Sequence, residues 1–307
     1  MDRSRARAGA LILLGGAAAG VAGAAAVRDV PLREARWTAT AALPRSLSFA
    51  PRECVRPSRA AAEARAAAIG RIAFRAPLLL GGQAARAGMS CATCHVNGRG
   101  NPNFLFPGLS GAPGTADVTA SLMSSHRGDG IFNPKPIPDL AGPPGKLKIS
   151  RTAAGALESF IHGLVTEEFD GPEPPPEVLA GLAAYVRALD PSACRGGEGR
   201  VRLAGPLAEV DTAVALARTS DGGTRRLLLA AARSTLGAID ERFSALPADR
   251  AMIRAADADL ATIRAGQADF ARWDGAWPAR RRSLLRDERR SLYAADQVAA
   301  LFRARER

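Results

Sequence analysis

Aromatic residues are scarce in this sequence of 307 residues, where tryptophan, tyrosine and phenylalanine together make up only 5%. Sandwiches and barrels of β-strands use aromatic and β-branched side chains heavily, so this scarcity disfavours them. Alanine, arginine and glycine dominate instead, and hydrophobic residues still make up 47% of the chain. That content is enough for a buried core, and alanine is the best helix former. We therefore predict an all-α fold.

Cysteine is rarer still, and the four cysteines fall into two sets. Cys91 and Cys94 enclose Ala92 and Thr93 and are followed directly by His95, which makes a C-x-x-C-H sequence. Two thiols on one helical turn can both bond to the vinyl groups of a porphyrin, and the histidine then faces the iron. A thioredoxin-like pair or a zinc site would need a βαβ setting or a second C-x-x-C, and the sequence offers neither. The motif predicts one covalently attached haem c, with His95 as the proximal iron ligand.

The other two cysteines, Cys54 and Cys194, lie on either side of the haem motif. In an oxidising compartment they would form a disulfide that ties the two ends of the haem region together. Two free thiols are the alternative, because the distance between the two Cα atoms cannot be read from a sequence.

The first residues indicate export. Arg3, Arg5 and Arg7 precede an uncharged, apolar stretch at residues 8–27, which contains a run of small residues near its end. Residues 1–26 therefore read as a secretory signal peptide, with an uncleaved membrane anchor as the alternative. Attachment of c-type haem is completed outside the cytoplasm in bacteria, so the two signals agree. We expect a periplasmic protein, anchored to the inner membrane if the leader is retained.

Proline divides the middle of the chain. Four prolines between residues 27 and 58 predict a linker or wrapping segment, and eight between residues 96 and 150 predict a long loop without extended regular elements. Apolar spacing predicts helices at residues 59–74, 152–165 and 177–189. Residues 59–195 would then form one haem domain, in which the porphyrin supplies part of the apolar core.

Residues 205–307 have a different composition, rich in alanine, leucine and arginine with a helical apolar period. The pattern predicts a separate α-helical domain of unknown role, built as a helical hairpin or small bundle. We expect its helices at residues 207–217, 224–243, 248–273 and 278–303. The arginines between residues 280 and 290 are best interpreted as a solvated face, with a docking site for an acidic partner as the alternative.

Several segments around the haem motif are similar in sequence to one known family. They are residues 70–74, 80–81 and 88–90, the C-A-T-C-H run itself, and residues 136–140 and 177–189. With these, residues 59–192 resemble the cytochrome c fold as found in the di-haem cytochrome c peroxidase superfamily. The resemblance implies a cytochrome c-like haem domain closed by the helix at residues 177–189. It ends before Cys194.

The chain departs from that superfamily in two respects. A complete member has two C-x-x-C-H motifs and moves electrons from a high-potential haem to a peroxidatic haem, whereas this chain has one motif. The resemblance also implies a distal methionine or histidine near residues 146–151, where neither residue type occurs.

Few side chains could supply the sixth iron ligand, because the chain has only three histidines and four methionines. Met123 is the first candidate and His126 the second, since their segment could fold over the distal face of the haem. Met123 could instead pack on the porphyrin, and His126 could be solvated. His162 and Met89 are weaker candidates. An open, five-coordinate iron is the remaining alternative.

The net charge of +12 comes almost entirely from arginine, since lysine occurs only at Lys135, Lys146 and Lys148. A positive surface could steer an acidic redox partner protein or rest on an anionic membrane surface. Basic residues do not alternate with aromatic ones, so we expect no nucleic-acid partner.

Taken together, these features predict an exported mono-haem c-type cytochrome that transfers single electrons to or from a partner redox protein. One alternative is a peroxidase-type haem enzyme that reduces peroxide at an open distal site. Another is a haem-binding subunit of a membrane complex. Electron transfer needs only a six-coordinate iron, whereas a peroxidase also needs a vacant position, an acid–base residue and a second electron source.

Overall fold

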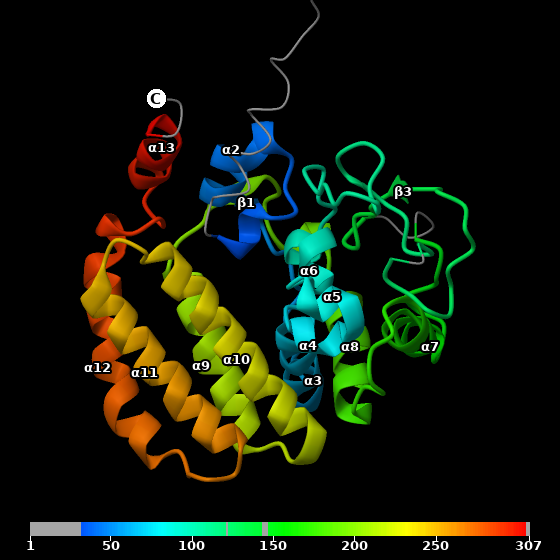
Figure 1. Ribbon diagram of the computed structural model, residues 1–307. Coiled ribbons are helices and arrows are strands. Elements are labelled where there is room, and N and C mark those ends of the chain that lie inside the picture. The colour runs from blue at the N-terminus through cyan, green and yellow to red at the C-terminus, as the bar shows by residue number, and fades with distance from the viewer. Residues whose placement is uncertain (1–31, 121, 143–146, 305–307) are drawn as a thin grey trace, which may run out of the picture.

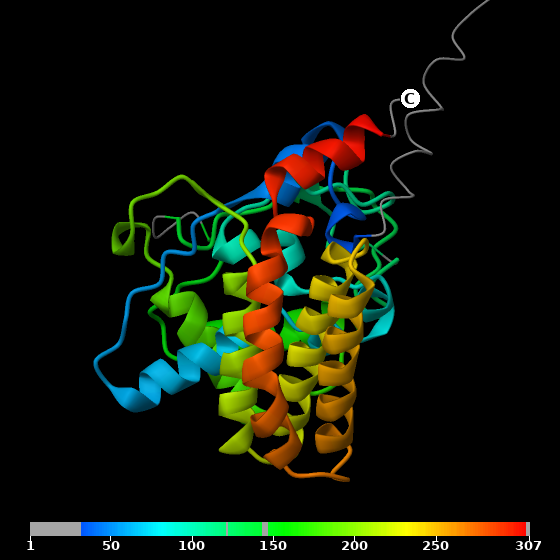
Figure 2. The same cartoon turned by 90° about the vertical axis from the view of Figure 1, so that its left-hand side faces the viewer.

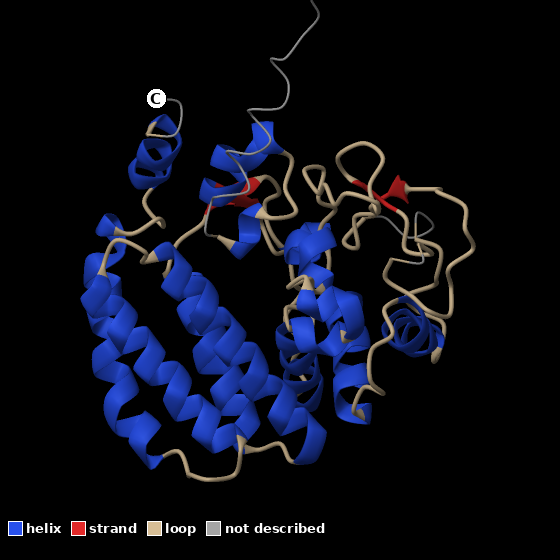
Figure 3. Cartoon of the chain, in the orientation of Figure 1, coloured by secondary structure: helices blue, strands red, loops and turns tan. Residues whose placement is uncertain are grey.

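A computed structural model describes residues 32–304, apart from residue 121 and residues 143–146. The predicted leader at residues 1–26 lies outside the described residues. Of the residues that the structure describes, 57% are helical and 5% lie in strands, as the composition predicts for an all-α protein (Figures 1 and 3). Among the helices within the described part of the chain, none is both long enough and apolar enough to cross a membrane.

Two helices cross closely at the centre of the molecule (Figure 1): α3 (Ala61–Ala73) and α8 (Pro176–Ala188). Glycines stand at the contact, and a Cβ atom added to Gly70 would lie 1.9 Å from the carbonyl oxygen of Gly181. A Cβ on Gly181 would lie 2.8 Å from the carbonyl oxygen of Ala66. The absence of side chains lets the two backbones touch. Both helices agree with the predicted ranges to within three residues.

Three short helices follow α3 along the chain: α4 (Pro77–Leu80), α5 (Gly82–Arg86) and α6 (Cys91–Cys94). A long loop then leads to α7 (Ala156–Gly163), which packs against α8. In the described part of this loop, the longest regular pieces are a 3-10 turn and two short strands. The strands, β2 (Thr115–Ala116) and β3 (Lys135–Pro136), pair antiparallel. The proline-rich segment is therefore irregular, as expected (Figure 3).

The C-terminal part forms a bundle of long helices that lie side by side in both views (Figures 1 and 2). They are α9 (Ala204–Arg218), α10 (Gly222–Arg242), α11 (Pro247–Arg264) and α12 (Ala271–Asp287), followed by the short α13 (Ala295–Arg303). Buried side chains of α9 and α10 continue those of α3 and α8 in one hydrophobic cluster. The bundle and the region around the haem motif thus share a core.

The predicted boundary between the last two long helices was wrong. The chain turns at Gly266, whose φ of +73° favours glycine, and Pro278 lies inside α12. Trp273 and Trp277 stack with ring centroids 4.6 Å apart, and the Trp277 indole donates a hydrogen bond to Asp211. These contacts anchor α12 in the bundle just before the proline, and the helix continues past it to Asp287 although Pro278 lacks a backbone donor. The predicted helix at residues 278–303 is likewise broken, because α12 ends at Asp287 and α13 begins at Ala295.

Residues 32–57 lie across both halves of the molecule. Near their start, Arg33 forms an ion pair with Glu241 of α10 at 2.9 Å. Further on, the backbone of Trp37 accepts a hydrogen bond from Leu105 in the long loop. The segment continues into α2 (Leu43–Ser48), which packs on α13, and into β1 (Phe49–Pro51), which pairs antiparallel with β4 (Glu198–Arg200).

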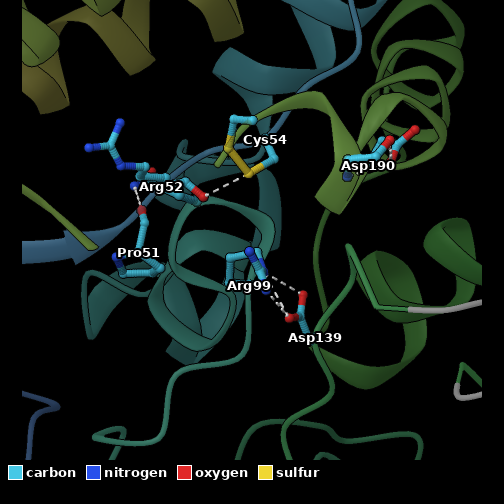
Figure 4. Close-up of a disulfide and its surroundings, with 9 residues drawn as sticks. Pro51, Arg52, Cys54, Arg99, Asp139 and Asp190 are labelled. Atoms are coloured by element: carbon cyan, nitrogen blue, oxygen red, sulfur yellow. Dashed lines mark hydrogen bonds and ion pairs between the residues drawn. A yellow bond between two sulfur atoms is a disulfide. The ribbon is translucent and has the colours of Figure 1, made fainter. Parts of the chain in front are cut away.

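A disulfide joins Cys54 to Cys194, with Cα atoms 5.2 Å apart, which confirms the expected bridge (Figure 4). It connects the segment after β1 to the segment after α8, where the amide of Asp190 donates a hydrogen bond to the carbonyl of Cys54. The two cysteines are 140 residues apart in sequence, and in the chain-entropy model such a cross-link contributes about 5 kcal/mol. The bridge encloses the whole haem motif.

The crossing of α3 and α8 can be tested by adding a single methyl group. In Gly70→Ala the new Cβ meets backbone that cannot move without separating the helices, so we expect a destabilisation of about 1–3 kcal/mol. Urea unfolding followed by circular dichroism measures it. Gly275→Ala in α12 is the matched control, because no other group lies within 4 Å of its added Cβ and helix propensity favours alanine. Equal midpoints for Gly70→Ala and the unmodified chain would contradict the close crossing.

Candidate haem site

The C-x-x-C-H motif lies on the one-turn helix α6, and its neighbours fix where that turn begins. The amide of Ser90 donates a hydrogen bond to Thr93 Oγ1 at 3.0 Å. The amide of Ala92 donates to the carbonyl of Phe74 at the end of α3, at 3.1 Å. Cys91 and Cys94 are three residues apart on this turn, so both thiols project from the same side. Both are free thiols and half-buried.

The surroundings of the two thiols keep them protonated. Burial raises the pKa of Cys91 to about 12, and burial together with the neighbouring Cys91 raises the pKa of Cys94 to about 12. A thioredoxin-like couple works the other way, since it needs a thiol whose pKa is lowered. Within the described ranges, no group of three or more His, Cys, Asp and Glu side chains is arranged to hold a metal ion. The two thiols therefore lack the lowered pKa that a thioredoxin-like couple needs.

His95 follows α6 directly, and its ring is oriented by a backbone carbonyl from a distant part of the chain. Nδ1 of His95 lies 3.0 Å from the carbonyl oxygen of Pro138. A carbonyl can only accept a hydrogen bond, so Nδ1 carries the proton and Nε2 keeps its lone pair. Burial lowers the pKa of His95 to about 4, although Pro138 and the Asp139 carboxylate both raise it. A neutral imidazole held through Nδ1 is the usual state of a histidine that binds a metal through Nε2.

The turn that carries Pro138 is itself fixed to the haem motif. Arg99 binds both carboxylate oxygens of Asp139 through Nε at 2.8 Å, and its Nη2 lies 2.7 Å from Oδ2 (Figure 4). Asp139 Oδ1 also accepts a hydrogen bond from the amide of Ala141 at 2.9 Å. Sequence reasoning did not single out these residues. About 40 residues separate them, and only the fold shows that they meet.

A network of charged side chains lies behind the motif and reaches the C-terminal bundle. Arg75 donates to Asn97, two residues after His95, at 3.0 Å and to Glu53 at 2.9 Å. The same guanidinium lies 3.0 Å from Glu209 of α9. Asn97 has a φ of +54°, and its side-chain amide donates to the carbonyl of Pro51. The chain just after His95 is thus tied to α3, α9 and the segment before the disulfide.

Glu53 is the acidic centre of this network. Arg71 lies 2.7 Å from its carboxylate, and the Tyr185 hydroxyl of α8 donates to it at 2.7 Å. Burial alone raises the pKa of Glu53, but Arg75 and Arg71 outweigh it and lower the pKa to about 2. The carboxylate therefore stays ionised and keeps the network intact at neutral pH.

The two candidates for the distal ligand lie in different environments. Met123 is 2% exposed and belongs to the large buried cluster against which Cys91 and Cys94 pack. The side chain of His126 is 63% exposed, and its Nδ1 lies 2.9 Å from Asp170. The weaker candidate His162 also lies near the surface, where its Nε2 contacts Glu173 at 2.8 Å. The assignment of either first candidate to the iron stays a prediction.

Compared with known proteins, the chain matches no protein-family model, no curated protein and no solved structure. Two protonated thiols on one face of a turn, followed by a histidine with an available Nε2, fit the attachment of a haem c.

Glu53 gives the fold a defined pH dependence. Its pKa is lowered from 4.5 to about 2 in the folded chain, so its stabilising effect is complete above pH 4.5 and is lost as the pH falls towards 2. The shift corresponds to a contribution on the order of 3 kcal/mol. Between pH 4.5 and 2, the free energy of unfolding should fall by about 3 kcal/mol more in the unmodified chain than in Glu53→Gln. Urea unfolding at several pH values measures the difference.

The control for this experiment is Glu198→Gln, which removes an exposed carboxylate paired with Arg45. We expect its stability to follow the pH curve of the unmodified chain. Parallel curves for Glu53→Gln and the unmodified chain would show that Glu53 is not held ionised by the network.

Proposed function

We propose that this chain is a mono-haem c-type cytochrome that transfers single electrons to or from a partner redox protein. The observation that carries the proposal is the combination of two free thiols on α6 with a His95 ring oriented by Pro138. On this proposal residues 59–195 form a cytochrome c-like domain around the cofactor.

Each residue of the motif has a separate role in this proposal. Cys91 and Cys94 hold one haem c through thioether bonds, and His95 binds the iron through Nε2. The bound iron supplies a one-electron couple. The protein contributes a fixed ring orientation through Pro138 and a partly buried environment around the thiols.

For the distal ligand we favour Met123 over His126. Met123 is already buried among apolar side chains, so binding the iron would require no further desolvation of its thioether. His126 would have to leave the solvent and give up or rearrange its contact with Asp170. A methionine ligand completes six-coordinate iron, which suits electron transfer and leaves no site for a substrate.

The disulfide between Cys54 and Cys194 supports export, because such bonds persist in oxidising compartments. We place the protein in the periplasm, with the segment at residues 1–26 as a leader or as an anchor to the inner membrane. The partner is a redox protein, and the positive charge of the chain favours an acidic one. A haem-binding subunit of a membrane complex is the form that an uncleaved anchor would favour.

The optical spectrum of the protein matured in a periplasm tests this proposal. We expect low-spin ferric iron with a methionine-to-iron charge-transfer band, unchanged by carbon monoxide after reduction or by peroxide. Met123→Ala should become high-spin and bind carbon monoxide. His126→Ala is the matched control and should keep the spectrum of the unmodified protein.

Two other results would change the assignment. A high-spin spectrum of the unmodified protein that responds to both ligands would overturn electron transfer in favour of the peroxidase alternative. Loss of the low-spin spectrum in His126→Ala alone would make His126 the distal ligand.

A further inference from the structure

Two side-chain contacts join the same two segments of the chain beside the proposed haem. One is the hydrogen bond from His95 Nδ1 to the Pro138 carbonyl, at 3.0 Å. The other is the ion pair between Arg99 and Asp139. Arg99 lies four residues after His95, and Asp139 directly follows Pro138. The two contacts therefore act as neighbouring cross-links between the loop after α6 and the turn at residues 137–142.

The ion pair is the contact that defines the shape of this turn. The Asp139 carboxylate binds Arg99 on one side and accepts from the amide of Ala141 on the other. The carbonyl of Asp139 accepts from the amide of Gly142 at 3.0 Å. The two segments also approach closely at Gly100, where an added Cβ would lie 3.0 Å from the carbonyl oxygen of Ile137. Pro138 itself is exposed, so packing alone does not hold its carbonyl on His95.

We infer that Arg99 and Asp139 are positioning residues that hold the Pro138 carbonyl on the proximal histidine and thereby set the reduction potential. This inference rests on the proposed function. A hydrogen bond donated by Nδ1 makes the imidazole a more basic ligand, and a more basic ligand stabilises ferric over ferrous iron. Weakening the ion pair lets the turn move, weakens that hydrogen bond and raises the potential.

The charges of the pair provide a competing explanation with a different sign. If Arg99 and Asp139 acted only through their electrostatic field, removing the positive Arg99 would stabilise ferric iron and lower the potential. Removing the negative Asp139 would raise it. Positioning instead predicts that both substitutions raise the potential. Arg99→Gln is therefore the variant that separates the two explanations.

The experiment measures the midpoint potential of the periplasmically matured protein by optical redox titration. We expect Arg99→Gln and Asp139→Asn both to raise it, and the double variant R99D/D139R to bring it back towards the original value. Exchange of the His95 Nδ1 proton with solvent, followed by NMR, should become faster in both single variants. Arg250→Gln is the control, because Arg250 of α11 forms an ion pair with Asp240 of α10 within the C-terminal bundle and should change neither quantity.

A lower or unchanged potential in Arg99→Gln, with Nδ1 exchange at the original rate, would overturn the positioning role. If that variant does not fold, Arg99→Lys distinguishes positioning from a field effect. Lysine keeps the positive charge of arginine but lacks the planar guanidinium that binds both carboxylate oxygens. Positioning predicts a smaller rise for it and a field effect predicts no change. Absence of covalent haem in the unmodified protein would instead refute the proposed function.

Discussion

The close crossing of α3 and α8 is the constraint on which the rest of the structure depends. Because the backbones touch at Gly70 and Gly181, the ends of both helices arrive beside the haem motif. The end of α3 places the Phe74 carbonyl where it accepts from the first turn of α6. The residue after α8, Leu189, packs against Gly98 in the loop that follows His95. The motif is thus held on both sides by one helix pair.

Charge extends this arrangement across the molecule. Arg75, at the end of α3, binds Glu53 before the disulfide, Asn97 after the haem motif and Glu209 in the bundle. A second buried arginine, Arg242, has a comparable role at the far end of α10, where it donates to backbone carbonyls of residues 47 and 292. Both guanidiniums join segments that are distant in sequence. The C-terminal bundle therefore stabilises the region around the C-x-x-C-H motif through a shared core and through ion pairs.

Much of the fold and part of the candidate site could be predicted from local sequence patterns. The C-x-x-C-H spacing placed both thiols on one helical turn, and apolar periodicity placed most of the long helices. The break expected at Pro278 was wrong because both indoles before it, Trp273 and Trp277, are buried and Trp277 donates to Asp211 of α9, and such tertiary contacts have no local pattern. The ion pair between Arg99 and Asp139 could not be predicted either, because it joins two loops that are 40 residues apart in sequence. Periodicity describes which face of an element is apolar, and it cannot show which loops meet.

The covalent state of the matured chain tests the central claim most directly. The protein should be produced in a periplasm with active c-type haem attachment, denatured and measured by mass spectrometry, beside the variant C91S/C94S. The account predicts that the unmodified chain, after any leader removal, is heavier by the mass of one haem and that the variant carries none. An unmodified chain without bound haem, or haem retained in the variant, would contradict it.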